Sequence, residues 1–269
     1  MSELVTEALM QSIKALSEEA GRAIMDVYAT DFSVKEKEDF SPLTEADMAA
    51  HHAIAAGLAE LTPDIPVLSE ESADTITWEQ RREWPCFWMV DPLDGTKEFV
   101  KRNGEFTVNI ALIEGHDAVL GAVHVPAKGE TYIAARGLGA HKSAGGALVP
   151  ISVTNPAAKP LRVAGSRSHG NEQTQRFVER MGDTEMVAIG SALKLCLVAE
   201  GAVDIYPRFG PTSEWDTAAA QCVVEQAGGR VTETNLEPLR YNAKESILNP
   251  FFLVFGDTSV NWAQYNDAP

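Results

Sequence analysis

Cysteine and long hydrophobic runs are scarce in this chain of 269 residues. The three cysteines, Cys86, Cys196 and Cys222, are odd in number, and their spacing suits neither a disulfide framework nor a zinc site. No stretch approaches the roughly 20 apolar residues of a membrane span, and the N-terminus lacks the basic and apolar regions of a signal peptide. We therefore expect reduced core thiols, no transmembrane segment and a cytoplasmic protein.

Positive charge is also scarce, because 22 lysines and arginines stand against 39 aspartates and glutamates, a formal net charge of −17 at pH 7. Such an acidic surface repels nucleic acid and anionic membranes, so nonspecific binding to either is not expected. It would also repel a small anionic substrate, unless bound divalent cations reverse the sign locally. The chain is 45% hydrophobic, enough for a sizeable core in one layered domain or in two packed lobes.

The N-terminal third predicts two helices followed by two strands. Apolar residues at helical spacing predict helices over residues 3–28 and 45–61, with Thr44 as the N-cap of the second. "PVLSE" then predicts a short strand, and "CFWMVDPLDG" predicts a buried strand that ends in a turn.

The remainder predicts an antiparallel meander and then a second portion in which strands and helices alternate. Alternating segments punctuated by glycine and proline predict the meander over residues 106–143. The composition shifts at "VPISVTNPAAKP", which is the best boundary between two lobes. We expect an α+β fold with an N-terminal α+β lobe over 1–155 and a C-terminal α/β lobe over 156–269.

Two aspartates leave the end of the predicted buried strand in "DPLDGTKEF". Asp91 and Asp94 are three residues apart, and both carboxylates can converge on one point. Close like charges repel unless a cation lies between them, and oxygen ligands select hard cations such as Mg²⁺. Gly95 lets the backbone approach a ligand, and a helix that begins near Thr96 would favour a phosphate. Taken alone, an aspartate-capped tight turn explains the stretch equally well.

Further carboxylates lie at the ends of other predicted elements. "LSEES" places Glu70 and Glu71 at the end of a strand, and "EWDTAAA" places Asp216 at the start of a helix. A solvated surface pair and an N-cap that contributes about 1 kcal/mol are the simpler interpretations of these two stretches. All three stretches follow apolar residues, and together they favour one shared site.

At these residues the sequence resembles the inositol monophosphatase superfamily. "DPLDGTKEF" and "EWDTAAAQCVVEQAGG" are similar to its two signatures, while "EDFSPLTEAD" and "PVLSEES" are similar to its N-terminal and glutamate motifs. The "TKEF" ending, "SRSH" and "DIYPRFGPTSEWDTAA" resemble the CysQ branch, the 3'(2'),5'-bisphosphate nucleotidases. The resemblance covers nearly the whole chain and implies a layered α/β/α/β/α sandwich.

The resemblance also implies roles for individual residues. It implies catalytic roles for three residues: Thr96 with Glu70 orients the attacking water, and Asp47 binds the outer metal or its waters. Two or three Mg²⁺ ions are held by Glu70, Asp91, the carbonyl of Leu93, Asp94 and Asp216. The substrate-binding residues are Glu70, Leu93, Asp94, Gly95, Thr96, Ser191, Lys194, Arg208 and Asp216.

Two basic residues and one short segment are candidates for the rest of a nucleotide. Lys194 and Arg208 are candidates for a non-reacting phosphate, because arginine can hold phosphate through two hydrogen bonds. The segment from Ser166 to His169 could line a nucleotide pocket. A surface charge or a turn residue explains each of these positions equally well.

We therefore expect an Mg²⁺-dependent phosphatase that uses metal-activated water to convert 3'-phosphoadenosine 5'-phosphate to AMP and phosphate. The alternatives are an inositol monophosphatase or related sugar phosphatase, a noncatalytic metal- or nucleotide-binding protein, and a purely structural acidic protein. The resemblance further implies inhibition by Li⁺ and a role in clearing a by-product of sulfate assimilation. A homodimer, and a peripheral location on the cytoplasmic face of the membrane, stay open.

Overall fold

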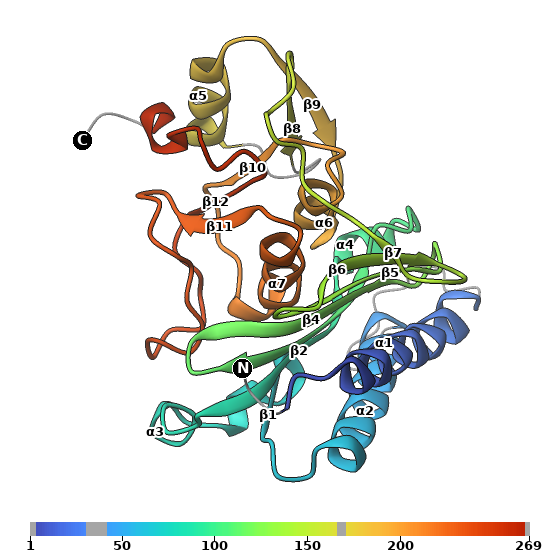
Figure 1. Cartoon of the computed structure of the whole chain (residues 1–269). Helices are drawn as coiled ribbons and strands as arrows, with labels where there is room; N and C mark the ends of the chain where they lie inside the picture. The colour runs from blue at the N-terminus through green and yellow to red at the C-terminus, as the bar shows by residue number, and fades with distance from the viewer. Residues whose placement is uncertain (1–3, 31–41, 166–170, 267–269) are drawn as a thin grey trace.

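The computed structural model describes residues 4–30, 42–165 and 171–266 of the chain. Two β-sheets lie on opposite sides of an inner layer formed by helices α6 (Leu193–Ala199) and α7 (Ala218–Gln226) (Figure 1). Further helices cover the outer faces of both sheets. This is the expected α/β/α/β/α sandwich.

The first sheet has seven strands in sequence order. The first two strands pair in parallel, and all later pairs are antiparallel, which confirms the meander predicted from the sequence. The central strands β3 (Thr107–Glu114) and β4 (Asp117–Val125) are buried along almost their whole length, because helices cover both faces of the sheet. The strands are β1 (Val67–Ser69), β2 (Cys86–Asp94), β3 (Thr107–Glu114), β4 (Asp117–Val125), β5 (Glu130–Ala135), β6 (Gly139–Ala144) and β7 (Val149–Pro150).

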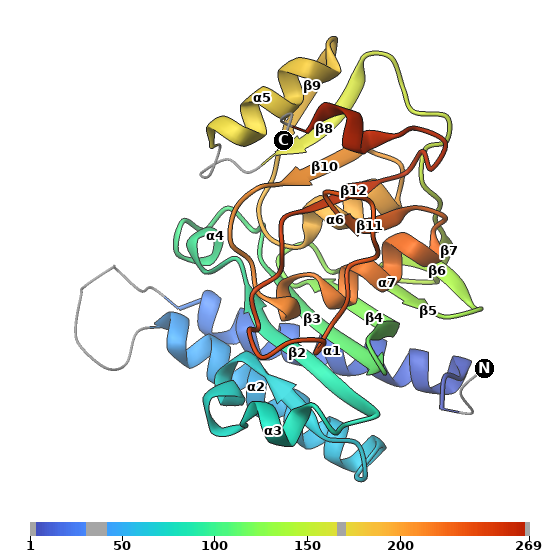
Figure 2. The same ribbon diagram turned by 90° about the vertical axis from the view of Figure 1, so that its left-hand side faces the viewer.

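Helices α1 (Glu7–Tyr28) and α2 (Pro42–Leu61) cover the outer face of this sheet (Figure 2). Thr6 caps α1 by accepting a hydrogen bond from the Leu9 amide. The prediction that Thr44 caps the second helix is wrong, because α2 already begins at Pro42. Proline suits a first helical position, since its fixed φ is helical and its missing N–H would have no partner there.

The second sheet has five strands in the order β11-β12-β10-β8-β9, with β8 parallel to β9 and β10. Helix α5 (Glu172–Met181) and the 3₁₀ turn η3 (Trp262–Tyr265) cover its outer face. The strands are β8 (Leu161–Gly165), β9 (Thr184–Ala188), β10 (Ile205–Arg208), β11 (Arg230–Glu233) and β12 (Phe252–Phe255).

Short elements complete the fold around the inner layer. Helix α7 is buried from Ala218 to Val224 because it lies between the two sheets. The elements are η1 (Glu70–Thr75), α3 (Trp78–Arg81), α4 (Thr96–Val100), α6 (Leu193–Ala199), η2 (Glu214–Asp216) and α7 (Ala218–Gln226).

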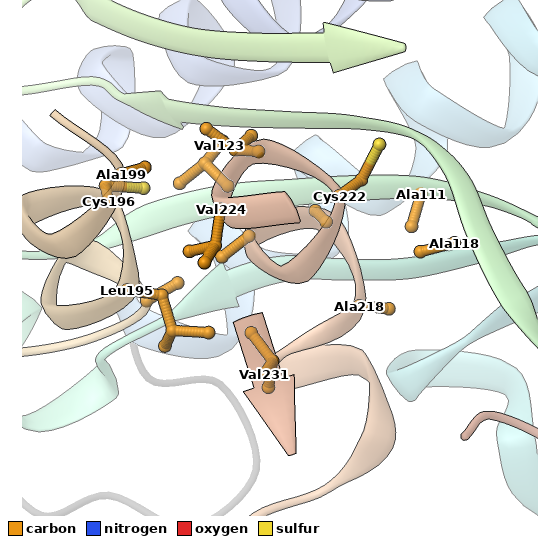
Figure 3. Close-up of a cluster of buried hydrophobic side chains, with 14 of the residues drawn as sticks. Ala111, Ala118, Val123, Leu195, Cys196, Ala199, Ala218, Cys222, Val224 and Val231 are labelled. Atoms are coloured by element: carbon orange, nitrogen blue, oxygen red, sulfur yellow. The ribbon is translucent and has the colours of Figure 1, made fainter. Parts of the chain in front are cut away.

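The largest apolar core spans both sheets. Figure 3 shows Val123 of β4, Val224 of α7 and Val231 of β11 in this cluster. The predicted boundary at residues 155 and 156 falls in the connection between β7 and β8, while this core crosses it. All three cysteines are free thiols, and two of them, Cys196 and Cys222, are buried in the core. Among the described residues, no helix is long and apolar enough to span a membrane.

Candidate active site

A β-bulge at the end of β2 brings Asp91 and Asp94 to the same side of the strand. Residues three apart in a regular strand point to opposite faces. Here Asp91 pairs with Asn109 and Asp94 with Thr107, so three steps on β2 match two steps on β3. The extra residue in β2 reverses the alternation. The convergence expected from the sequence therefore depends on this irregularity.

Asp216 joins the two aspartates from the other half of the chain. One ligand oxygen from each of Asp91, Asp94 and Asp216 lies within 4.8 Å of the others. Asp216 ends the 3₁₀ turn η2 rather than starting a helix, because its carboxylate accepts the Ser213 amide at 2.8 Å in a capping box. The expected helix start is therefore displaced, since α7 begins only at Ala218.

The three carboxylates repel one another in a buried setting. Burial raises the pKa of Asp91 well above its ordinary value, and the charges of Asp94 and Glu70 raise it further. Burial also raises the pKa of Asp216 to about 7, with a contribution from Asp94. A group that is costly to ionise here would be stabilised as a carboxylate by a cation.

Two further acids extend this cluster. Glu70 follows β1, and because β1 is parallel to β2, the two strand ends lie at one edge of the sheet. Burial and the charges of Glu71 and Asp94 raise the pKa of Glu70. Burial and Glu71 raise the pKa of Asp47, on α2, to about 8. The Asp47 Oδ1 atom is buried without a hydrogen-bond partner among the described residues.

This donor set fits a hard divalent cation. It consists of carboxylate oxygens, which Mg²⁺ prefers, and it includes an acceptor in Asp47 that the described residues leave without a donor. Asp91 and Asp94 each accept one backbone hydrogen bond, from the amides of Leu93 at 3.0 Å and Ala192 at 2.6 Å. Those two bonds orient the carboxylates and leave further lone pairs for a metal.

A glycine turn joins the bulge to helix α4. Gly95 has φ +92°, a left-handed conformation, and a methyl group there would lie 3.1 Å from the Glu105 carbonyl oxygen. Glycine is therefore needed both for its conformation and for close approach. Thr96 begins the short helix α4, and the residue is exposed.

A cavity of about 150 Å³ lies beside the acidic cluster. Lys194 is 7% exposed, and its Nζ donates to the Ser191 carbonyl oxygen at 2.7 Å. Burial lowers the pKa of Lys194 to about 8, although the charge of Asp94 opposes this shift. Arg208 donates to the Pro211 carbonyl oxygen at 2.9 Å. Of the predicted residues, the cavity is lined by Asp94, Gly95, Ser191, Lys194, Arg208 and Asp216.

The remaining predicted residues have different locations. Glu70, Asp91 and Asp47 belong to the acidic cluster rather than to the cavity wall. Leu93 is buried within the bulge, and Thr96 is exposed beyond it. The segment Ser166 to His169 lies outside the described residues.

The inositol monophosphatase family model matches residues 5–261. The chain belongs to this family. It is 49% identical over 248 residues to the 3'(2'),5'-bisphosphate nucleotidase CysQ of Escherichia coli O157:H7, covering 91% of this chain and 99% of the relative. It is 35% identical over 260 residues to the CysQ of Haemophilus influenzae, covering 96% of each.

Solved structures of the inositol monophosphatase family agree with these matches. The crystal structure of CysQ from Bacteroides thetaiotaomicron superposes with a TM-score of 0.86 at 41% identity, covering 94% of this chain and 99% of that one. An inositol monophosphatase from Zymomonas mobilis superposes with a TM-score of 0.79 at 23% identity, covering 96% and 97%, and it supports the fold alone.

The sequence analysis missed three residues at the active site of this protein. Tyr206 and Glu98 line the cavity, and Glu105 contacts the loop that precedes α6. Tyr206 could have been found, because it lies two residues before Arg208 on one strand and therefore on the same face. Glu105 carries no such signal, since its partner Gly190 is far along the chain.

Proposed function

We propose that this protein is a magnesium-dependent 3'(2'),5'-bisphosphate nucleotidase that converts 3'-phosphoadenosine 5'-phosphate to AMP and phosphate. The observation that carries the proposal is the convergence of Asp91, Asp94 and Asp216 beside a cavity that also contains Lys194 and Arg208. A metal-binding centre next to two cationic side chains suits a substrate with one reacting and one non-reacting phosphate. The relatives named as such nucleotidases support this choice of substrate.

The proposed metal ligands are those expected from the family resemblance. Two or three Mg²⁺ ions would be held by Glu70, Asp91, the Leu93 carbonyl, Asp94 and Asp216. Bound there, the ions would supply the chemistry of a two-metal phosphatase, namely an activated water molecule and positive charge beside the phosphate and the leaving oxygen. They also offset the negative charge of the cluster, so that an anionic substrate can enter.

The protein groups position the substrate and the water. Thr96 and Glu70 orient the attacking water by accepting its hydrogen bonds, and Asp47 holds outer waters. The amides of Gly95 and Thr96 hold the reacting phosphate. Lys194 and Arg208 hold the non-reacting phosphate, Lys194 as a buried ammonium and Arg208 as a guanidinium fork. Ser191 places its carbonyl oxygen against Lys194 and thereby fixes the position of the ammonium group.

The test is phosphate release from 3'-phosphoadenosine 5'-phosphate with Mg²⁺, with EDTA, and with added Li⁺. Wild type should turn over only with Mg²⁺, Li⁺ should inhibit it, and Asp94→Asn should lower kcat by at least about a hundredfold. Asp64→Asn, which changes an exposed aspartate away from the cluster, is the matched control and should keep wild-type activity.

The same assay separates the alternatives. A substantial preference for inositol 1-phosphate would keep the phosphatase but reject the nucleotide substrate. Mg²⁺ binding without turnover of any phosphate ester would support a noncatalytic metal- or nucleotide-binding protein instead.

Location and assembly complete the proposal. We propose a cytoplasmic enzyme, which the three free thiols support. A peripheral location on the membrane face and a homodimer are the alternatives, and flotation with anionic vesicles and light scattering of the purified protein distinguish them.

A further inference from the structure

Two carboxylates, Asp94 at the end of β2 and Glu105 in the connection before β3, hold the loop that leads into helix α6. The Gly190 amide donates to Glu105 Oε2 at 2.9 Å in a buried contact. The Ala192 amide donates to Asp94 Oδ2 at 2.6 Å. The two bonds lie on either side of Ser191, so this residue is held from both sides by groups of the other half of the chain.

Ser191 needs such support because its backbone is strained. Its φ is +48°, in the left-handed region that non-glycine residues seldom adopt. This conformation directs the Ser191 carbonyl oxygen to Lys194 Nζ, 2.7 Å away. The position of the buried ammonium group therefore depends on the conformation of the loop.

Close packing leaves the loop little freedom. A methyl group on Gly190 would lie 2.5 Å from Glu98 Cγ and 3.1 Å from the Glu105 carbonyl oxygen. A methyl group on Gly95 would lie 3.2 Å from Ser191 Cβ. Three segments thus meet at contact distance, namely the start of α4, the residues before β3, and the loop before α6. A shift of the loop would move Ser191 relative to the metal-binding aspartates.

Glu105 is built to hold this loop rather than to bind substrate. It is 8% exposed and does not line the cavity. Its own backbone is fixed by the Asn103 side chain, which accepts the Glu105 amide at 2.9 Å. A carboxylate that accepts a buried backbone N–H forms a stronger bond than a neutral acceptor does.

We propose that Glu105 is a positioning residue that acts through Gly190 to hold Ser191 and Lys194 where they can bind the non-reacting phosphate. Glu105 touches neither the substrate nor the metal ligands in this scheme. The inference deepens the proposed nucleotidase function and rests on it.

The kinetic test compares Glu105→Ala with Glu105→Gln, whose amide oxygen can still accept the Gly190 hydrogen bond. For Glu105→Ala, we expect KM for 3'-phosphoadenosine 5'-phosphate to rise about tenfold, which corresponds to about 1.4 kcal/mol. The kcat and the inhibition constant of inorganic phosphate should change less than about twofold. Glu105→Gln should restore most of the KM, and Glu60→Ala on the exposed side of α2 should behave as wild type.

Hydrogen exchange tests the same contact without turnover. Amides 190–193 should exchange at least about tenfold faster in Glu105→Ala than in wild type and Glu105→Gln. If wild type does not hydrolyse the nucleotide, the proposed function fails. Unchanged hydrogen exchange in Glu105→Ala would separately show that Glu105 does not hold the loop through the Gly190 amide. If Glu105→Ala does not fold, Gly190→Ala displaces the loop instead, and an unchanged KM in that variant would overturn the inference. The inference would also be overturned if both Glu105 variants showed the same fall in kcat and the same rise in KM.

Discussion

At the scale of single residues, the buried aspartates should destabilise the metal-free protein. Asp91 is 1% exposed, and the charges of Asp94 and Glu70 lie close to it. Because the folded state raises the pKa of Asp91, ionisation at neutral pH lowers the free energy of unfolding in the absence of a cation. Asn at this position can still accept the Leu93 amide through its side-chain oxygen. We expect Asp91→Asn to stabilise the metal-free protein, because the amide carries no charge that burial and the neighbouring carboxylates would oppose.

The measurement is a thermal melt in EDTA and in Mg²⁺. In EDTA, Asp91→Asn should melt a few degrees above wild type. Addition of Mg²⁺ should raise the Tm of wild type and leave that of the variant nearly unchanged. A variant that melts below wild type in EDTA would show that Asp91 stabilises the fold on its own, against the metal-site interpretation.

His124 provides a pH dependence away from the metal site. It lies on β4 and is buried against α1, and its Nδ1 lies 2.9 Å from Thr131 Oγ1. Burial lowers its pKa from 6.5 to about 4, while the groups that face it act in both directions: Glu18 raises the pKa, as does the backbone of Glu130, and Lys14 and Arg22 lower it.

The sign of the effect follows from proton binding. Between pH 6.5 and 4 the unfolded chain binds a proton on His124 that the folded chain does not, so stability falls as pH falls through this window. At pH 5 the loss is about 2 kcal/mol relative to pH 7. Urea unfolding at pH 7 and pH 5 measures the fall in the free energy of unfolding between the two pH values. This fall should be about 2 kcal/mol smaller in His124→Gln than in wild type. Equal losses in the two proteins would mean that His124 does not titrate as its burial implies.

The residues of the site show what sequence can and cannot supply. The spacing of Asp91 and Asp94 predicted that they converge, but the bulge that produces the convergence depends on pairing with β3. Asp216 was found by its motif, although its place in η2 depends on the Ser213 cap. The contact between Glu105 and Gly190 exists only because the two halves of the chain pack together, and no local pattern encodes it.

At the scale of elements, the packing of β4 against α7 supports the position of Asp216. A methyl group on Gly121 would lie 2.1 Å from the Ala219 carbonyl oxygen, a backbone atom that cannot move without moving α7. The turn that carries Asp216 immediately precedes α7. The pattern of apolar residues and turns predicted the strand β4, but the need for glycine at position 121 comes from the opposing helix α7.

Gly121→Ala should therefore affect both stability and metal binding. We expect a loss of about 3 kcal/mol from overpacking, and a several-fold rise in the Mg²⁺ concentration needed for half-maximal activity. Urea unfolding and a Mg²⁺ titration of phosphate release measure the two effects. The control is Gly146→Ala, where an added methyl group meets no atom within 4 Å. Wild-type values for Gly121→Ala would mean that β4 and α7 separate without cost.

At the scale of the whole molecule, the inner helical layer should make both halves unfold together. One core includes Phe87 of β2, Val224 of α7 and Val254 of β12, so neither sheet can bury its inner face without α7. Loss of either half would expose this apolar surface to water, which is strongly unfavourable. We therefore expect the predicted lobes 1–155 and 156–269 to form one cooperative unit.

Two tryptophans report on the two halves of the molecule. Trp88 lies in the core beneath α1 and α2, and Trp262 lies in the core beneath α5. One variant keeps only Trp88 of the five tryptophans, and a second keeps only Trp262. The urea transitions of the two variants, followed by fluorescence, should coincide with each other and with the transition followed by circular dichroism. Residues 1–155 expressed alone should not fold, because α7 and its buried side chains are missing. Separate transitions for Trp88 and Trp262 would instead mean that the shared core is weaker than the outer cores, and that the lobes are independent folding units joined at the active site.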